Sequence, residues 1–172
     1  MKYFKITVDK HYMPPMPTGW YGILDKKTLE KKKSYQMPKH MLFYVEDHMQ
    51  MVFTDVITFP CFMVSKMVRN VIEKYDRSAR FARVVLYDKK RKDSMAYYIP
   101  FLNGIVLDSV GNAQNDTGEE SVLNEKTLIE KVIEGRAIAE LKMPKGMCIV
   151  MRMDLAESIL RRDAVGIGLE EI

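Results

Sequence analysis

The spacing of hydrophobic and polar residues divides the chain into short strands and two amphipathic helices. The clearest pattern surrounds Ser65, where apolar residues recur at the spacing of one helical face: Val64, Met67, Val68, Val71, Ile72 and Tyr75. Ser65 stands where the N-cap of such a helix is expected, and serine is among the residues preferred there. The pattern predicts a helix over residues 65–75.

A second helix is predicted over residues 154–162. At its start, Asp154 and Glu157 have the spacing of a capping box, in which each side chain bonds to the backbone of the other residue. At an offset of 88 residues, its apolar positions match those of the first helix: Met67, Val68, Val71 and Ile72 against Leu155, Ala156, Ile159 and Leu160. A strand is predicted after each helix. The offset therefore indicates an internal repeat, with a chance match of two amphipathic helices as the alternative.

The strands are predicted from short apolar segments, several of them alternating with polar residues. They lie at residues 2–8, 41–45, 51–57, 83–87, 95–99, 105–110, 147–151 and 165–169. The segments 83–87 and 95–99 flank the charged sequence D-K-K-R-K-D-S, which predicts a hairpin. Short strands in meander-like runs, with only two solid helices, predict an α+β fold with a mainly antiparallel sheet.

The length of 172 residues is that of one domain with a substantial core. We expect a single domain over residues 1–172, with residues 1–58 as an N-terminal elaboration of a core at 59–172. The segment 25–33 predicts a short basic helix within that elaboration.

Composition argues against several classes of protein. A hydrophobic content of 47% and a charged content of 29% are ordinary for a globular chain and argue against general disorder. The longest apolar runs are far shorter than the about 20 residues that cross a bilayer. The first ten residues lack the apolar segment of a signal peptide, and the two cysteines form neither a disulfide framework nor a zinc motif. We therefore expect a cytoplasmic protein.

Charge is distributed unevenly along the chain. Residues 1–100 hold 19 Lys and Arg against 10 Asp and Glu, a formal charge of +9, whereas residues 101–172 hold 8 against 13, a charge of −5. A polarised surface attracts an oppositely charged partner over a distance. The alternative is that folding interleaves the two segments and removes the asymmetry.

The sequence contains none of the motifs of common catalytic or nucleotide sites. Gly166 and Gly168 lie within a strand pattern that leads into no helix, which is unlike a phosphate-binding loop. A metal site could in principle draw on the residues His40, Glu46, Asp47 and His48. No pair among them has the helical spacing that brings ligands together, so we interpret them as a polar turn and expect no metal and no cofactor.

Cys61 stands in the sequence F-P-C-F-M-V-S, just before the first predicted helix. A cysteine nucleophile needs a thiolate, which a helix N-terminus and a neighbouring base favour. Cys61 lies four residues ahead of Ser65 and among apolar neighbours, so we interpret it as a buried structural residue. Pro60 is expected to keep this segment extended as it leads into the core.

Two charged segments are candidate contacts for a macromolecular partner. The K-K-R-K run at 89–92 has the charge to bind phosphates, but it falls at a hairpin tip without interleaved aromatic residues, so we expect it to be solvated. The segment 111–120 predicts a loop and contains the acidic residues Asp116, Glu119 and Glu120. They are candidate contacts for a basic partner, with a solvated loop as the simpler interpretation.

The layout from Phe59 to the C-terminus resembles a family of bacterial immunity proteins of polymorphic toxin systems, immunity protein family eleven. The matching features are F-P before an apolar run, V-S at 64–65 opening a helix, a strand with two adjacent tyrosines, I-V-L-D at 105–108, and the closing G-I-G-L-E-E-I. The resemblance implies a non-catalytic protein that binds and neutralises a cognate toxin. It implies no catalytic residues.

Two other functions remain as alternatives. One is a small ligand-binding domain or enzyme of unknown substrate, which would require an apolar pocket with converging His40, His48 or Cys61. The other is a nucleic-acid binder, which the K-K-R-K run would serve.

Overall fold

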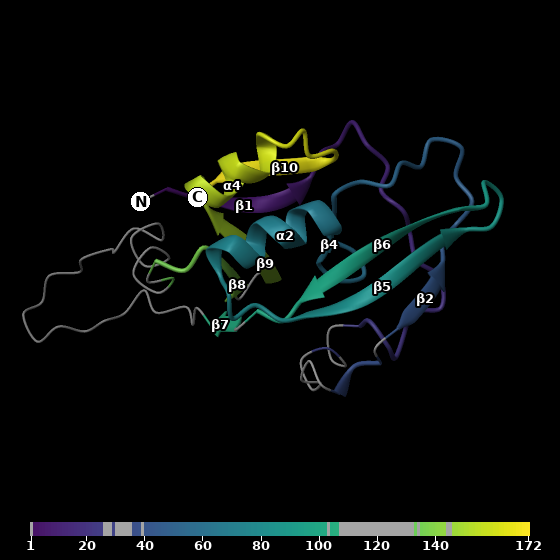
Figure 1. Cartoon of the computed structure of the whole chain (residues 1–172), viewed down its shortest axis with the longest axis horizontal. Coiled ribbons are helices and arrows are strands. Elements are labelled where there is room, and N and C mark those ends of the chain that lie inside the picture. Colours follow the sequence, from purple (N-terminus) through teal and green to yellow (C-terminus); the bar gives the residue numbers. More distant parts are fainter. Residues whose placement is uncertain are drawn as a thin grey trace, which may run out of the picture.

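The computed structural model describes residues 2–25, 29, 36–38, 40–102, 104–106, 133, 135–143 and 146–172. Within these residues the chain forms two five-stranded sheets and the two helices α2 (Lys66–Tyr75) and α4 (Met153–Leu160), which pack against each other (Figure 1). The predicted α+β class is confirmed. In the described part of the chain, no helix has the length and apolarity needed to cross a membrane.

The strands divide between two mostly antiparallel sheets. The first sheet has the order β10 (Ile167–Glu171), β1 (Tyr3–Val8), β9 (Gly146–Arg152), β8 (Ile138–Met143) and β7 (Gly104–Val106). The second has the order β2 (Met41–Tyr44), β5 (Phe81–Asp88), β6 (Asp93–Pro100), β4 (Met63–Ser65) and β3 (Val56–Ile57). Among the strand pairs of the described residues, β7–β8 and β2–β5 are parallel and the others are antiparallel. The expectation of one sheet is wrong, because the apolar pattern locates strands without showing which of them pair.

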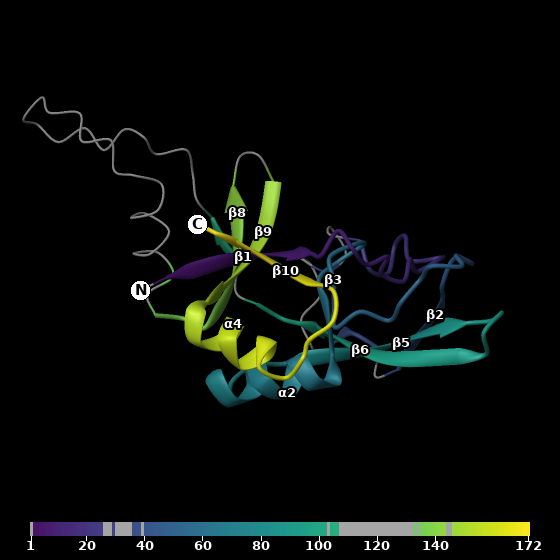
Figure 2. The same cartoon turned by 90° about the horizontal axis from the view of Figure 1, so that it is seen from above.

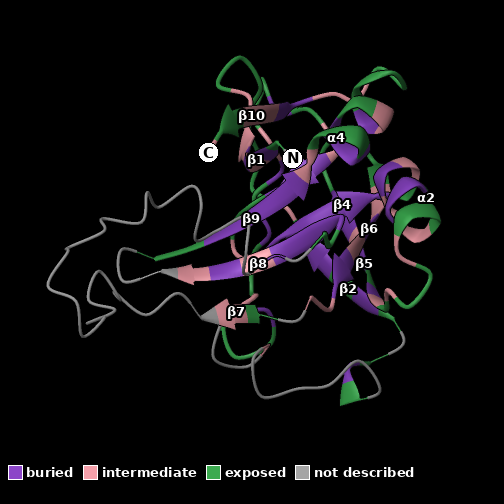
Figure 3. Cartoon of the chain, turned by 90° about the vertical axis from the view of Figure 1, so that its left-hand side faces the viewer, coloured by how far each residue is buried: buried purple, intermediate pink, exposed green. Residues whose placement is uncertain are grey.

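Three apolar clusters hold these layers together. The first lies between the two sheets and the two helices, and both sheets contribute to it. The second covers the opposite face of the second sheet, where Leu24, Trp20 and Phe53 pack on the strands. The third covers the opposite face of the first sheet. Figure 3 shows the resulting band of buried residues along β4, β8 and β9.

Helix α2 begins as predicted. Ser65 is its N-cap, and the Ser65 Oγ accepts a hydrogen bond from the backbone N–H of Val68 at 3.3 Å. The buried side chains of the helix are Val68, Val71 and Ile72. The local pattern was sufficient here, because the cap and the apolar face both lie within eleven residues of sequence.

Helix α4 begins one residue earlier than predicted, and the capping box is wrong. Its N-cap is Arg152, which makes no side-chain capping bond. The Arg152 guanidinium instead bonds the Asp154 carboxylate at 2.7 and 2.8 Å, and Asp154 accepts the N–H of Leu155 at 2.9 Å. Glu157 forms a 3.5 Å ion pair with Arg161. The start of the helix is set by β9, which stays paired with β1 up to Arg152.

The two helices belong to units of the same topology. We call β3, β4, α2, β5 and β6 the α2 unit, and its strands lie in the order β3-β4-β6-β5. We call β8, β9, α4, β10 and β1 the α4 unit, and its strands lie in the order β8-β9-β1-β10. All neighbours within these four-stranded sets are antiparallel. The chain order is permuted, since the N-terminal strand β1 completes the C-terminal unit.

The strands on both sides of each helix follow the predicted repeat, and the two helix starts differ from its offset of 88 by one residue. Aligning the N-caps Ser65 and Arg152 gives an offset of 87. This alignment matches Ile72 with Ile159, and both are fully buried. The offset of 88 would match Ile72 with Leu160, which is 46% exposed.

The segment 51–57 forms less strand than predicted. Only Val56–Ile57 makes β3, because the residues before it bond to other parts of the chain. Asp55 exchanges two 2.7 Å hydrogen bonds with Val165: its N–H donates to the Val165 carbonyl, and its Oδ2 accepts the Val165 N–H. Gly166 follows with φ +75, and a Cβ there would lie 2.4 Å from Thr54 Cγ2. This contact joins the α2 unit to the α4 unit.

The segment before β4 bends where an extended chain was predicted. The Phe59–Pro60 peptide bond is cis, and residues 59–61 form a bend. Phe62 and Val64 enter the central core as expected. Cys61 packs in the cluster on the other face of the second sheet.

Candidate partner-binding surface

The second sheet has one face that its helix covers only in part. We call the part of this face away from β3 and β4 the open face; strand register places on it the side chains of Leu42, Tyr44, Arg83, Val85, Tyr87, Ser94, Ala96 and Tyr98. The alternate residues of the same strands, among them Val84, Leu86 and Tyr97, are buried in the cluster on the opposite side. The face arises because side chains along a strand alternate between the two sides of a sheet.

Helix α2 covers only the Tyr98 end of the open face. Strands β2, β5 and β6 extend beyond both helices (Figures 1 and 2). Leu42 is 58% exposed and Tyr44 is 42% exposed. The Tyr44 and Tyr87 rings meet edge to face, with centroids 6.0 Å apart. The β2 edge of the open face is therefore an exposed apolar and aromatic surface.

A groove containing three arginines lies where α2 meets the open face. Its volume is about 530 Å³, and we call it the arginine groove; it is lined by Arg69, Glu73, Ala79, Arg80, Phe81, Arg83 and Tyr98. Three arginines but only one acidic residue line this groove. The groove is therefore the positively charged border of the open face.

Arg69 is held rigidly between α2 and the sheet. Its guanidinium carbon lies 4.7 Å from the Tyr98 ring centroid and 5.6 Å from that of Phe81. Its nitrogens donate to Glu73 Oε1 at 2.7 and 3.0 Å, and this bonding raises the pKa of Arg69 above its usual value. Arg69 thus remains a fixed cation stacked on two rings.

Arg80 and Arg83 differ from Arg69 in that neither is bonded to Glu73 within the described residues. Arg80 Nη1 donates to the backbone carbonyls of Ser78 and Ala79 at 3.0 and 3.2 Å. Arg83 is exposed and, within the described part of the chain, forms no ion pair. Arg83 is therefore the guanidinium most accessible to a partner's carboxylate.

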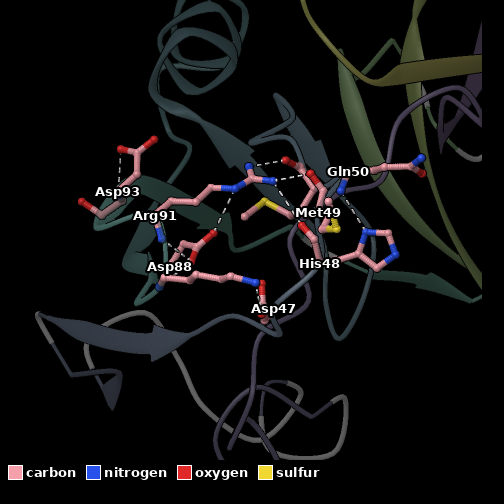
Figure 4. A network of polar contacts seen from close by, with 10 residues as sticks. Asp47, His48, Met49, Gln50, Asp88, Arg91 and Asp93 are labelled. Atoms are coloured by element: carbon pink, nitrogen blue, oxygen red, sulfur yellow. Dashed lines mark hydrogen bonds and ion pairs between the residues drawn. The ribbon is translucent and has the colours of Figure 1, made fainter.

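The K-K-R-K run at the tip of the β5–β6 hairpin is exposed, as predicted, but Arg91 is also bonded to the protein. Arg91 donates to the backbone carbonyls of Met51, Met49 and His48 at 2.5, 2.8 and 3.1 Å (Figure 4). It also lies 3.5 Å from the buried carboxylate of Asp88. The hairpin tip is thus bonded to the backbone of the segment 48–51. The sequence could not predict these bonds, because the acceptors are backbone carbonyls rather than side chains.

The two lysines before Arg91 are also engaged. Lys90 forms a 2.8 Å ion pair with Asp47. The Lys89 ammonium lies 3.8 Å from the centroid of the Tyr44 ring, so this cation reaches the open face.

The other predicted candidates do not converge. His40, Glu46, Asp47 and His48 are exposed, and the described residues contain no group of three His, Cys, Asp or Glu side chains arranged to hold a metal. His48 Nδ1 accepts the N–H of Gln50 at 3.2 Å, as in a local turn. The acidic candidates Asp116, Glu119 and Glu120 lie outside the described residues, as do most of the predicted basic helix at 25–33 and the loop at 111–120.

Cys61 is a buried free thiol, as predicted. Its side chain is 7% exposed, and burial raises its pKa to about 12. At neutral pH the thiol is therefore fully protonated, and a protonated thiol is a poor nucleophile. Burial also raises the pKa of the second free cysteine, Cys148.

Sequence reasoning missed the residues of the open face, although part of the signal was present. In β5, buried Ala82, Val84 and Leu86 alternate with the residues of the open face, among them Arg83. The positions of Arg69 and Arg80 carry no such signal, because their approach to Tyr98 depends on how α2 packs on the sheet.

The chain matches no protein-family model. No curated protein sequence matches it.

Proposed function

We propose that this chain is a non-catalytic immunity protein that neutralises a cognate bacterial toxin by holding it against the open face and the arginine groove. The observation that carries the proposal is the exposed apolar surface at Leu42 and Tyr44, on the edge strand β2, together with the arginine side chains that line the neighbouring groove. The toxin as partner is what the resemblance of residues 59–172 implies, and with it a cytoplasmic location.

The chemistry of this surface is that of a protein interface. Tyrosine and arginine are enriched among the residues that contribute most to binding between proteins. The rings of Tyr44 and Tyr98 lie on strands, so little side-chain freedom is lost when a partner covers them. The cations Arg69, Arg80, Arg83 and Lys89 favour a toxin whose contacting surface is acidic, because complementary charge speeds association.

Two observations favour a protein partner over a nucleic acid. The rings of Tyr44 and Tyr98 each already have a cation close by, Lys89 and Arg69 respectively, which restricts base stacking. The cations Arg69 and Lys90 are paired with carboxylates, and Arg91 with backbone carbonyls, so few are left to neutralise phosphates.

Toxin binding is tested by co-expressing the chain with toxins encoded beside its gene. We expect rescue of growth and a complex that co-purifies. Replacing the exposed cation by Arg83→Glu should weaken the complex by about tenfold or more, because it puts like charge against an acidic surface. The matched control is Arg136→Glu, an exposed arginine just before β8, which should leave affinity unchanged.

The proposal is wrong if no neighbouring toxin is bound or neutralised. It is also wrong if the free protein binds single-stranded DNA or RNA in a salt-sensitive way and Arg83→Glu removes that binding. Equal affinity of both charge-reversal variants for a bound toxin would place the contact on another surface.

A further inference from the structure

A cavity of about 300 Å³ lies where the two sheets meet, away from the open face. The α2 unit contributes the bend at Pro60 and Cys61 together with the end of β6. The α4 unit contributes the inner faces of β8 and β9 beyond the central core. Such a volume is at the lower end of the range for small-molecule sites.

Most of the cavity wall is apolar. Among the apolar side chains that line it are those of Cys61, Phe62, Ile99, Phe101, Leu102 and Ile149. Phe62, Ile149 and Cys61 are nearly fully buried, so this part of the wall is set by packing on both sides. The wall therefore suits a compact apolar group.

One end of the cavity is charged. Glu140 and Lys142 on β8 line it, while Ala139 and Leu141 between and beside them are buried on the opposite face of the sheet. A Cβ built at Gly104 would lie 3.0 Å from Lys142 Cε, 3.4 Å from Glu140 Oε1 and 3.7 Å from Lys142 Nζ. The carboxylate and the ammonium thus lie together over the bare backbone of Gly104.

We propose that this cavity binds a small zwitterion with a large apolar side chain, the chemistry of a hydrophobic α-amino acid. The apolar wall takes the side chain, and Glu140 and Lys142 take the ammonium and the carboxylate of the head group. A ligand with only one charge can make an opposite-charge contact with only one of these two groups. Both residues also make other polar interactions within the protein, so the head group joins an existing network.

The binding test uses the full chain and three probes: L-phenylalanine, L-leucine and L-methionine. Calorimetry should show binding of at least one of them, and its analogues lacking the ammonium or the carboxylate should bind at least tenfold more weakly. Lys142→Met should weaken binding to a similar degree. The control is Lys5→Met on β1, a strand of the same sheet whose Lys5 pairs with Glu170 outside the cavity, and it should not.

A second measurement follows the thiol that lines the cavity. In a Cys148→Ala background, bound amino acid should slow alkylation of Cys61 by iodoacetamide several-fold, because it occupies the same space. Gly104→Val should abolish both the heat and the protection. The valine side chain would fill the charged end of the cavity. Gly104 is exposed on the edge strand β7, so the substitution should leave the core side chains in place.

Three results would overturn this inference. One is the absence of both heat and protection of Cys61 up to the solubility limit of all three probes. Another is equal binding of the singly charged analogues. The third is binding that persists in folded Gly104→Val. None of them bears on toxin binding, because the cavity shares no lining residue with the arginine groove.

Discussion

The α2 unit and the α4 unit have the same strand order but present different surfaces. Strand register makes Tyr98 equivalent to Phe4 and Arg83 equivalent to Glu171. Arg83 is exposed in the arginine groove, whereas Glu171 forms a 3.2 Å ion pair with Lys2, the residue before the neighbouring strand β1. One topology thus supports an open cationic surface in one unit and an internally paired surface in the other, because function depends on side chains rather than on fold.

The units also begin their helices differently. Ser65 caps α2 through its hydroxyl, whereas the start of α4 is held by the ion pair of Arg152 with Asp154. Arg152 also donates to the carbonyl of Gly135, which ties the segment before β8 to the helix. The α2 cap is thus neutral, while the equivalent position in the α4 unit depends on charge.

The largest expected effect on stability comes from a substitution at Gly166, where the two units are in contact. Gly166→Ala should lower the free energy of unfolding by about 2–4 kcal/mol, because it adds a left-handed residue and a clash with Thr54. Urea unfolding measures this change. Gly22→Ala is the control, since Gly22 has φ +77 and open space around it, and should cost about 1 kcal/mol. Equal losses would show that the contact between Thr54 and Gly166 contributes nothing.

Removing the bonds between the hairpin tip and the segment 48–51 should have the next largest effect on stability. Arg91→Ala removes hydrogen bonds to three carbonyls and should cost about 1–2 kcal/mol in urea unfolding, the lower values reflecting its partial exposure. Lys90→Ala removes only the exposed pair with Asp47 and should cost less than about 1 kcal/mol. A loss at Lys90 as large as that at Arg91 would contradict this assignment.

The smallest expected effects come from substitutions at the two helix starts, and their costs in unfolding free energy should differ in their dependence on pH. Ser65→Ala should cost about 1 kcal/mol at every pH. Bonding to Arg152 lowers the pKa of Asp154, so its contribution is present above the unfolded pKa of about 3.9 and is lost as pH falls through the lower folded pKa. Because Asp154 is half-exposed, Asp154→Asn should cost less than about 1 kcal/mol at pH 6.

The measurement for both variants is urea unfolding at pH 6 and again below the folded pKa. The cost of Asp154→Asn should disappear at the lower pH while that of Ser65→Ala remains. A cost of Asp154→Asn that does not change with pH would show that the ion pair with Arg152 has no part in starting α4.

Local pattern predicted well whatever depends on neighbours in sequence. The helix after Ser65 and the hairpin around residues 88–94 lie close to their predicted positions, because spacing and turn residues determine them within a few positions. The capping box at Asp154 was wrong because the start of α4 does not depend on local residues alone. The start of α4 depends on where Arg152 leaves its pairing with Tyr3, and Tyr3 is distant in sequence.

By itself, the sequence determined the α+β class, the cap of α2, and the burial of Cys61 among apolar neighbours. Only the tertiary structure decided that β1 completes the C-terminal unit, that Arg91 binds backbone carbonyls, and that three arginines meet beside Tyr98. The physical reason is that these features join residues far apart in the chain. They are made through strand register, helix packing and carbonyl groups, none of which the order of side chains reveals.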